Sequence, residues 1–437
     1  MNNRILLDTA TPPDRGFLVQ IIPARRDREY ALLLAAELDH LARGAGLEVV
    51  GSRLYTSRRA VPATYLGSGV VEELAGEIQS CQAAVVVFNN PLTAVQQRNL
   101  EVKLAAKVVD RTGLILEIFA ARARTREGRL QVELASMLYQ QSRLVRSWTH
   151  LERQRGGVGM RGGPGETQIE VDRRLLRERV HQLKKQLIQV EQTRALQRQA
   201  RREVPLFTVA LVGYTNAGKS TLFNRLSGAQ VEAVDRLFAT LDPTLRQVTL
   251  PGGGRIILGD TVGFIRDLPH QLVAAFRATL EEVLEADLLL HLVDLSDPEW
   301  ADQEAAVMEV LRDLFQERGG VLEKSMLTVY NKIDQVATPG LLERLQARTD
   351  SLLLSALTGE GIPHLLQLLE QQANRNAPCF HLRIPYSEGA LLARLTREGW
   401  ILEKEEQEES LRLLIALPVA VAGRLRGELT PFLQHDH

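Results

Sequence analysis

Short apolar runs alternate with amphipathic stretches over residues 16–119. The strand-like runs lie at 17–22, 47–50, 83–88 and 107–110, and helix-like stretches separate them at 28–43, 69–78 and 94–104. Strands that alternate with helices usually form a parallel sheet with crossover helices. The pattern therefore predicts an α/β domain, which we place at residues 1–110.

A long helical pattern rich in arginine follows this domain and is interrupted by glycine. Residues 167–202 contain no Gly or Pro, and apolar side chains recur there at helical spacing. The segment 155–166 reads RGGVGMRGGPGE, and so many glycines cannot continue a helix. Residues 111–203 are therefore predicted to form an arm of two long helices joined by a glycine-rich basic tip.

Apolar strand-like runs and helix-like segments alternate again from residue 204 to residue 374. This region is predicted to be an α/β domain with a mainly parallel sheet. The rest of the chain contains strand-like stretches at 379–384 and 409–417 and helix-like stretches at 387–398 and 419–429. It predicts a small C-terminal α+β domain at residues 375–437. The fold class is α/β.

Composition agrees with a chain of several domains. The 437 residues are 45% hydrophobic and carry a net charge of −1, so more than one core is expected. Cys81 and Cys379 lie far apart and beside apolar runs, which predicts two buried cysteines and neither a disulfide framework nor a zinc cluster. The sequence shows neither a membrane-spanning run nor a signal-peptide pattern, so a cytoplasmic protein is expected. It also shows no coiled-coil seam, so a monomer is expected.

Residues 213–220 read GYTNAGKS, a complete GxxxxGKS phosphate loop between an apolar run and a helix-like segment. Gly213 and Gly218 allow backbone N–H groups to surround phosphates, and the start of the following helix adds positive potential. Lys219 is expected to neutralise the β- and γ-phosphates. The hydroxyl of Ser220 is a suitable ligand for Mg²⁺.

Three further motifs follow in the order that a guanine-nucleotide switch requires. Asp260 and Gly263 form a DxxG after an apolar strand, which predicts an aspartate beside the Mg²⁺ ion and a glycine N–H at the γ-phosphate. Residues 331–334 read NKID, and the Asp334 carboxylate can accept hydrogen bonds from two donors on guanine that adenine lacks. Residues 355–357 read SAL and fit the last loop that contacts the base. These four ordered motifs predict a GTPase.

The predicted contacts with GTP or GDP fall in these four motifs. They are Gly213, Asn216, Ala217, Gly218, Lys219, Ser220, Thr221, Asp260, Gly263, Asn331, Lys332, Asp334, Ser355, Ala356 and Leu357.

Four segments together resemble the HflX family of translation-associated GTPases. They are GYTNAGKSTLFN at 213–224, FATLDPT at 238–244, DTVGF at 260–264 and GGVGMRGGPGETQIE at 156–170. The resemblance covers residues 16–374. It implies binding to the large ribosomal subunit and splitting or rescue of stalled or idle ribosomes.

A contact between ribosomal RNA and residues near 153–166 is compatible with this resemblance. The tip carries Arg153, Arg155 and Arg161 beside glycines that permit close approach of the backbone to phosphates. Arm arginines that are only solvated or paired with acidic residues remain an alternative.

The resemblance also favours Thr240 over Thr244 as the switch threonine that joins Mg²⁺, because Asp-Pro stiffens the segment just after it. The predicted metal ligands are then Ser220, Thr240 and Asp260, and the predicted catalytic residues are Lys219, Thr240 and Gly263. Phe264 occupies the position where Ras-like enzymes have a water-orienting glutamine. Slow intrinsic turnover that rises on ribosome binding is therefore expected.

Three questions stay open in the sequence. Asn216 either helps to hold K⁺, as in some related GTPases, or makes a hydrogen bond that stabilises its loop. Family members are reported to bind ATP through the N-terminal part, yet no motif at 16–151 supplies a mechanism for a secondary ATPase activity. The alternative function is a GTP-gated scaffold that recognises a protein partner through its N-terminal domain, and an RNA-remodelling ATPase has less support.

Overall fold

The chain folds into two compact units in a computed structural model. One unit comprises residues 1–190, 236–238 and 269–276, and the other comprises 191–235, 239–268 and 277–437. The structure describes residues 14–23, 28–57, 60–154, 168–202, 206–229, 238, 240–266, 277–316, 325–336, 339–348, 351–375, 378–417 and 419–434.

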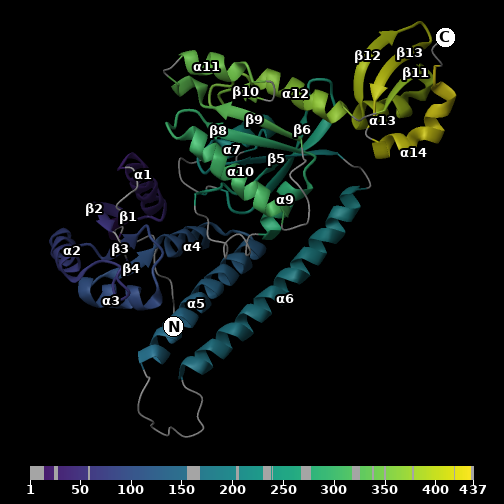
Figure 1. Cartoon of the computed structure of the whole chain (residues 1–437). Coiled ribbons are helices and arrows are strands. Elements are labelled where there is room, and N and C mark those ends of the chain that lie inside the picture. The colour runs from purple at the N-terminus through teal and green to yellow at the C-terminus, as the bar shows by residue number, and fades with distance from the viewer. Residues whose placement is uncertain are drawn as a thin grey trace. The chain divides into compact units, whose positions relative to one another are not determined.

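The first unit contains a four-stranded parallel sheet in the order β2-β1-β3-β4. Its elements are β1 (Arg15–Pro23), α1 (Arg28–Gly44), β2 (Glu48–Ser57), α2 (Ser68–Cys81), β3 (Val85–Phe88), α3 (Ala94–Leu104) and β4 (Lys107–Asp110), coloured purple to blue in Figure 1. Every residue of β3 is buried, as expected for a central parallel strand. The α/β architecture predicted for this region is confirmed.

Three helices follow the sheet: α4 (Arg111–Arg122), α5 (Arg126–Gln154) and α6 (Gln168–Arg202). Asp110 caps α4 by accepting a hydrogen bond from the Gly113 N–H (2.9 Å). The sequence prediction grouped α4 with the arm, but its Ile115 and Phe119 are buried and α4 packs against α1. The short break before α5 therefore separates a core helix from the two long ones.

The long helices α5 and α6 pack along an apolar seam. Its buried members are Leu130, Leu134, Val180, Leu183 and Leu187. They recur at the three- and four-residue spacing that defines one helical face. The expected glycine-rich tip, residues 155–166, lies outside the described residues, and so does the side chain of Arg153.

The second unit is built on a six-stranded sheet in the order β10-β9-β8-β5-β7-β6, drawn in teal and green in Figure 1. The strands are β5 (Phe207–Gly213), β6 (Thr244–Thr249), β7 (Arg255–Asp260), β8 (Leu288–Asp294), β9 (Ser325–Asn331) and β10 (Ser351–Leu353). Only β6 is antiparallel to its neighbour. The described helices are α7 (Lys219–Ser227), α9 (Arg277–Glu285), α10 (Trp300–Gln316), α11 (Pro339–Gln346) and α12 (Ile362–Asn374).

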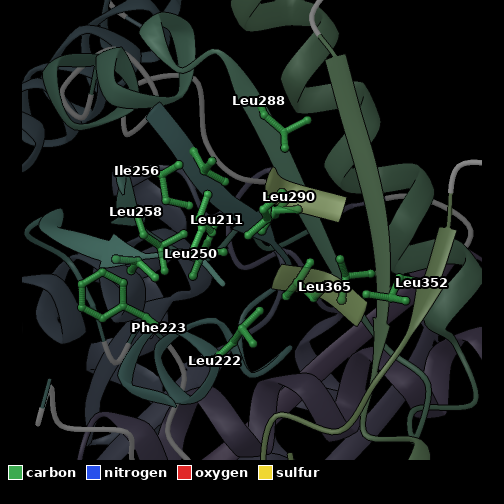
Figure 2. Close-up of a cluster of buried hydrophobic side chains, with 14 of the residues drawn as sticks. Leu211, Leu222, Phe223, Leu250, Ile256, Leu258, Leu288, Leu290, Leu352 and Leu365 are labelled. Carbon is green, nitrogen blue, oxygen red and sulfur yellow. The ribbon is translucent and has the colours of Figure 1, made fainter. Parts of the chain in front are cut away.

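A leucine-rich core fills one face of this sheet. Figure 2 shows side chains from the strands, including Leu211, Leu258 and Leu290, together with Leu222 and Phe223 of α7. Leu365 of α12 belongs to the same cluster. Because α7 packs on the strands through these side chains, the loop that precedes it is held at the carboxyl end of β5.

The C-terminal residues form an antiparallel sheet in the order β11-β13-β12 with two helices. The elements are β11 (Cys379–Pro385), α13 (Gly389–Glu398), β12 (Trp400–Glu406), β13 (Ser410–Ala416) and α14 (Val419–Leu429). The sequence pattern did not indicate β12, because this edge strand is exposed from Leu402 onwards and polar beyond it. The predicted α+β fold is confirmed.

Two remaining expectations can be compared with the structure. Cys379 is exposed and Cys81 is partly buried, so the prediction of two buried cysteines was wrong. A short strand with one solvent-facing side brings Cys379 to the surface. Within the described part of the chain, no helix combines the length and apolarity needed to cross a lipid bilayer.

Trp400 joins the C-terminal sheet to the core of the six-stranded sheet. It is 2% exposed and belongs to the same apolar cluster as Leu250 and Ile256. Its indole lies over the turn between β6 and β7, where a Cβ atom added to Gly254 would fall 1.4 Å from Trp400 Nε1. Only glycine leaves room for the indole at this turn.

We therefore expect Gly254→Ala to lower the free energy of unfolding by about 1 to 3 kcal/mol, because a methyl group would displace a buried indole. Thermal unfolding and a red shift of tryptophan emission would report the change. The matched control is Gly340→Ala on α11, where an added Cβ meets nothing within 4 Å. Equal stability of the two variants would contradict the packing role of Trp400.

Candidate nucleotide-binding site

The phosphate loop connects the end of β5 to the start of α7. Gly218 has a φ of +90°, and a Cβ atom there would lie 2.2 Å from Asn331 Nδ2. Glycine is needed for both the backbone conformation and the close approach. Asn216 has a φ of +65°, which asparagine tolerates better than most residues. Turn geometry alone therefore accounts for an asparagine at this position.

Lys219 is buried beneath this loop, with 6% of its surface exposed. Its Nζ donates to the carbonyl oxygens of Gly213 (3.0 Å) and Tyr214 (2.6 Å). Burial lowers the pKa of Lys219 to about 8, and Asp260 opposes this shift. The ammonium group is thus enclosed by carbonyl dipoles and has no bulk water to solvate it. An anionic ligand would stabilise its charged form.

Ser220, Thr240 and Asp260 meet at the end of β7. Asp260 Oδ2 accepts hydrogen bonds from Thr240 Oγ1 (2.7 Å) and Ser220 Oγ (2.8 Å), and the two hydroxyls lie 2.9 Å apart. Asp260 is fully buried, and burial raises its pKa although both hydroxyls oppose the shift.

The second carboxylate oxygen of Asp260, Oδ1, is buried and has no hydrogen-bond partner among the described residues. A buried carboxylate with a free oxygen and two adjacent hydroxyls is a set of hard oxygen donors that suits Mg²⁺. Thr244 was the alternative candidate for the switch threonine. It is the first residue of β6 and pairs with Asp260 in the antiparallel ladder.

The DxxG segment closes directly on the phosphate loop. A Cβ atom on Gly263 would lie 2.9 Å from Thr215 Cα and 3.0 Å from Lys219 Nζ. The next residue, Phe264, exchanges backbone hydrogen bonds with the loop: its N–H donates to Gly213 O (3.1 Å) and its carbonyl accepts from Thr215 N (2.8 Å). The Phe264 ring is 2% exposed. It packs in the interior and presents no polar group to the site.

Asn331, at the end of β9, ties the phosphate loop to the loop at 355–357. Its Nδ2 donates to Ala217 O (2.8 Å), and its Oδ1 accepts from Ala356 N (2.9 Å). Lys332 forms an ion pair with Asp294 at the end of β8 (2.5 Å). Asp334 lies in a short 3₁₀ turn, and its side chain is exposed.

All four sequence motifs thus lie at the carboxyl ends of β5, β7, β9 and β10, at one edge of the sheet. Gly213 to Thr221 form the loop and the first turn of α7, and Ser355 to Leu357 follow β10. Ligands of open α/β sheets bind at this edge. The structure therefore brings the four motifs to the same edge of the sheet.

Sequence reasoning missed three residues around this site. Asp294 fixes Lys332, and its position directly after an apolar strand could have indicated it. Arg225 of α7 hydrogen-bonds the 355–357 loop, and nothing in its local sequence signals this long-range contact. His291, on β8, is buried, and burial followed by the charge of Lys219 lowers its pKa to about 4. Neither ring nitrogen has a hydrogen-bond partner within the part of the chain that the structure describes.

Three family models match the chain in succession. The model described as GTP-binding GTPase N-terminal matches residues 34–120, and GTP-binding GTPase Middle Region matches 122–201. The model described as 50S ribosome-binding GTPase matches residues 208–332 and so contains the phosphate loop, the DxxG and the start of the NKID motif.

Curated relatives match almost the whole chain. The GTPase HflX of Magnetococcus marinus is 60% identical over 424 residues, which is 97% of each chain. The Escherichia coli GTPase HflX is 46% identical over 393 residues, 89% of this chain and 91% of that one. Among solved structures, the SsGBP complex with GDP is 22% identical to this chain, with a TM-score of 0.47. The match covers 83% of this chain and 99% of that one. The chain belongs to the HflX family of GTPases.

Proposed function

We propose that the site at the edge of the six-stranded sheet binds GTP with Mg²⁺ through Ser220, Thr240 and Asp260 and hydrolyses it to GDP and phosphate. The observation that carries this assignment is the buried cluster of these three side chains, in which Asp260 keeps one unbonded oxygen. When bound, the ion would neutralise charge on the β- and γ-phosphates. Thr240 belongs to the segment before β6 and would respond to the γ-phosphate.

Lys219 and the backbone around it would carry the phosphate contacts. The Nζ atom now donates to two loop carbonyls and would exchange them for phosphate oxygens. The N-terminus of α7 begins at this residue, and its unpaired N–H groups favour an anion. Gly263 lies beside both Lys219 and Thr215, where its N–H would reach the γ-phosphate once a ligand separates the two segments.

Phe264, the residue after Gly263, cannot be the group that orients the attacking water. Phe264 is apolar and buried, so it cannot hold a water molecule. The water would then be oriented by backbone groups or by a partner that rearranges the switch. Slow intrinsic hydrolysis that a partner stimulates follows from this arrangement.

Replacement of Lys219 by alanine should abolish hydrolysis, because positioning and charge stabilisation do most of the work of phosphoryl transfer. Single-turnover hydrolysis of GTP measures the effect. A circular dichroism spectrum like that of the parent serves as the control for folding. Normal turnover in a folded Lys219→Ala protein would exclude the proposed role.

Guanine selectivity would depend on Asp334, whose carboxylate is exposed and available to the base. In Asp334→Asn an amide NH₂ would oppose the donors of guanine, and a buried unpaired polar group costs about 1 to 3 kcal/mol. GTP should therefore bind more weakly and XTP relatively more tightly, as measured by nucleotide competition. ATP that displaces GTP efficiently from the parent protein would argue against a guanine site.

We further propose that the protein associates with the large ribosomal subunit and splits or rescues stalled or idle ribosomes in the cytoplasm. The description 50S ribosome-binding GTPase, which belongs to the model matching 208–332, supports this role. The alternative is a GTP-gated scaffold that recognises a protein partner through its N-terminal domain. Cosedimentation with purified large subunits, with and without a non-hydrolysable GTP analogue, separates the two.

We place the ribosomal contact at the arm near residues 153–166, of which the structure describes only the backbone of 153 and 154. Not every arginine of the arm is available for RNA, because Arg143 pairs with Asp110 (3.2 Å) and lies over the Tyr139 ring. Arg153, Arg155 and Arg161 at the tip are therefore the ones to change.

Replacing these three arginines together with alanine should leave intrinsic GTP hydrolysis nearly intact. It should weaken binding to large subunits and reduce their stimulation of hydrolysis. Phosphate contacts depend steeply on salt, so the mutant should also show a shallower salt dependence in cosedimentation. A triple variant that binds and is stimulated like the parent across the salt series would move the contact elsewhere.

Two narrower expectations stay predictions. A K⁺ ion at Asn216 would be detected as stimulation of hydrolysis by K⁺ that Na⁺ does not reproduce. A separate ATP site in the N-terminal part would survive Lys219→Ala, which removes the phosphate contact of the second unit.

The division into domains at 110, 203 and 374 also stays a prediction, and limited proteolysis would test it.

A further inference from the structure

Arg225 reaches from the last turn of α7 to the loop at 355–357. Its Nε donates to Ala356 O (2.7 Å), and its Nη2 donates to Leu357 O. The loop makes room for the guanidinium at Gly359, where a Cβ atom would lie 2.6 Å from Arg225 Nη1. Gly359 also has a φ of +96°, which side chains rarely adopt. Two consecutive carbonyl groups are thus held by one rigid, planar donor.

The backbone N–H groups of this loop are almost all committed to partners inside the protein. The donors, with their acceptors, are Ser355 N to Glu360 O (3.0 Å), Ala356 N to Asn331 Oδ1 (2.9 Å), Thr358 N to Ser355 Oγ (3.1 Å) and Gly359 N to Ser355 O (2.8 Å). Among the described residues, the N–H of Leu357 has no such acceptor. Its side chain is 66% exposed, so the loop presents this residue to the outside.

The orientation of that free N–H depends on the carbonyl that Arg225 binds. Ala356 C=O and Leu357 N–H belong to one planar trans peptide, in which the two groups point in opposite directions. Because Arg225 pulls the carbonyl towards α7, the N–H is directed away from α7. Guanine carries the acceptor O6 where adenine carries the donor N6–H₂, so only guanine can accept a hydrogen bond at that position.

We propose that Arg225 is a positioning residue for guanine selectivity. It holds the Ala356–Leu357 peptide so that the Leu357 N–H meets the O6 atom of guanine, and it does not itself touch the nucleotide. The proposal rests on the assignment of 355–357 to the base-contacting loop made above. It differs from the role of Asp334, which would accept hydrogen bonds from the N1–H and 2-amino donors of the base.

Competition against a fluorescent GDP analogue provides the test, because it reports the guanine site alone. The competitors are GDP, IDP and ADP; IDP keeps O6 and lacks the 2-amino group. In Arg225→Ala, GDP and IDP should each lose about tenfold in affinity, roughly the effect of one hydrogen bond, whereas the weak affinity for ADP should not fall. KM for GTP should rise and kcat at saturating GTP should stay within about twofold of the parent.

Two further variants separate positioning from general damage. Arg225→Lys keeps a positively charged donor group on a single nitrogen and should restore part of the GDP and IDP affinity, which also covers the case in which the alanine variant folds poorly. Arg344→Ala removes another exposed arginine, on α11, and should bind all three nucleotides like the parent.

A loss of GDP and ADP affinity by the same factor in Arg225→Ala would mean that the arginine only stabilises the fold. Unchanged GDP affinity would also overturn the proposal. If the parent itself did not prefer GDP to ADP, the assignment of the guanine loop would fail, and this inference would fail with it. A parent that prefers GDP and loses that preference in Asp334→Asn but not in Arg225→Ala would leave the proposed function intact and refute the role of Arg225 alone.

Discussion

A carboxylate without access to water, that of Asp260, is the group on which the arrangement of the site depends. Burial makes its ionised form costly, and the hydroxyls of Ser220 and Thr240 both donate to the same one of its two oxygens. A divalent cation would compensate for the other. The three side chains come from the first turn of α7, the segment before β6 and the end of β7. A ligand that changes the charge at this point therefore acts on all three elements together.

The loop at 355–357, proposed to contact the base, is held in a different way. Neutral and charge-assisted hydrogen bonds from side chains fix its backbone. Asn331 joins Ala217 of the phosphate loop to Ala356, and Arg225 of α7 holds the next two carbonyls. Helix α7 thus contacts the phosphate end through Lys219 and the base end through Arg225. This short helix packs on β5, β6 and β7, so the spacing between Lys219 and Arg225 is held by the helix and by the strands beneath it.

Much of this arrangement could be predicted from the sequence, because each motif is local. The phosphate loop requires glycines and a lysine within eight residues, and DxxG and NKID each follow a strand whose apolar run is visible in the sequence. The alternation of strands and helices likewise predicted the parallel sheets. Features with weak local signals were missed: the polar edge strand β12 and the exposed position of Cys379.

The sequence by itself determined the chemistry of the site, since motif residues at fixed spacing define which groups can meet a phosphate or a guanine. Only the tertiary structure decided which residues hold those groups in place. Arg225 and Ala356 are 131 positions apart, and Trp400 lies against a glycine in a turn of a different sheet. Contacts of this kind arise when packed strands and helices bring distant residues together, so no periodicity or local spacing records them.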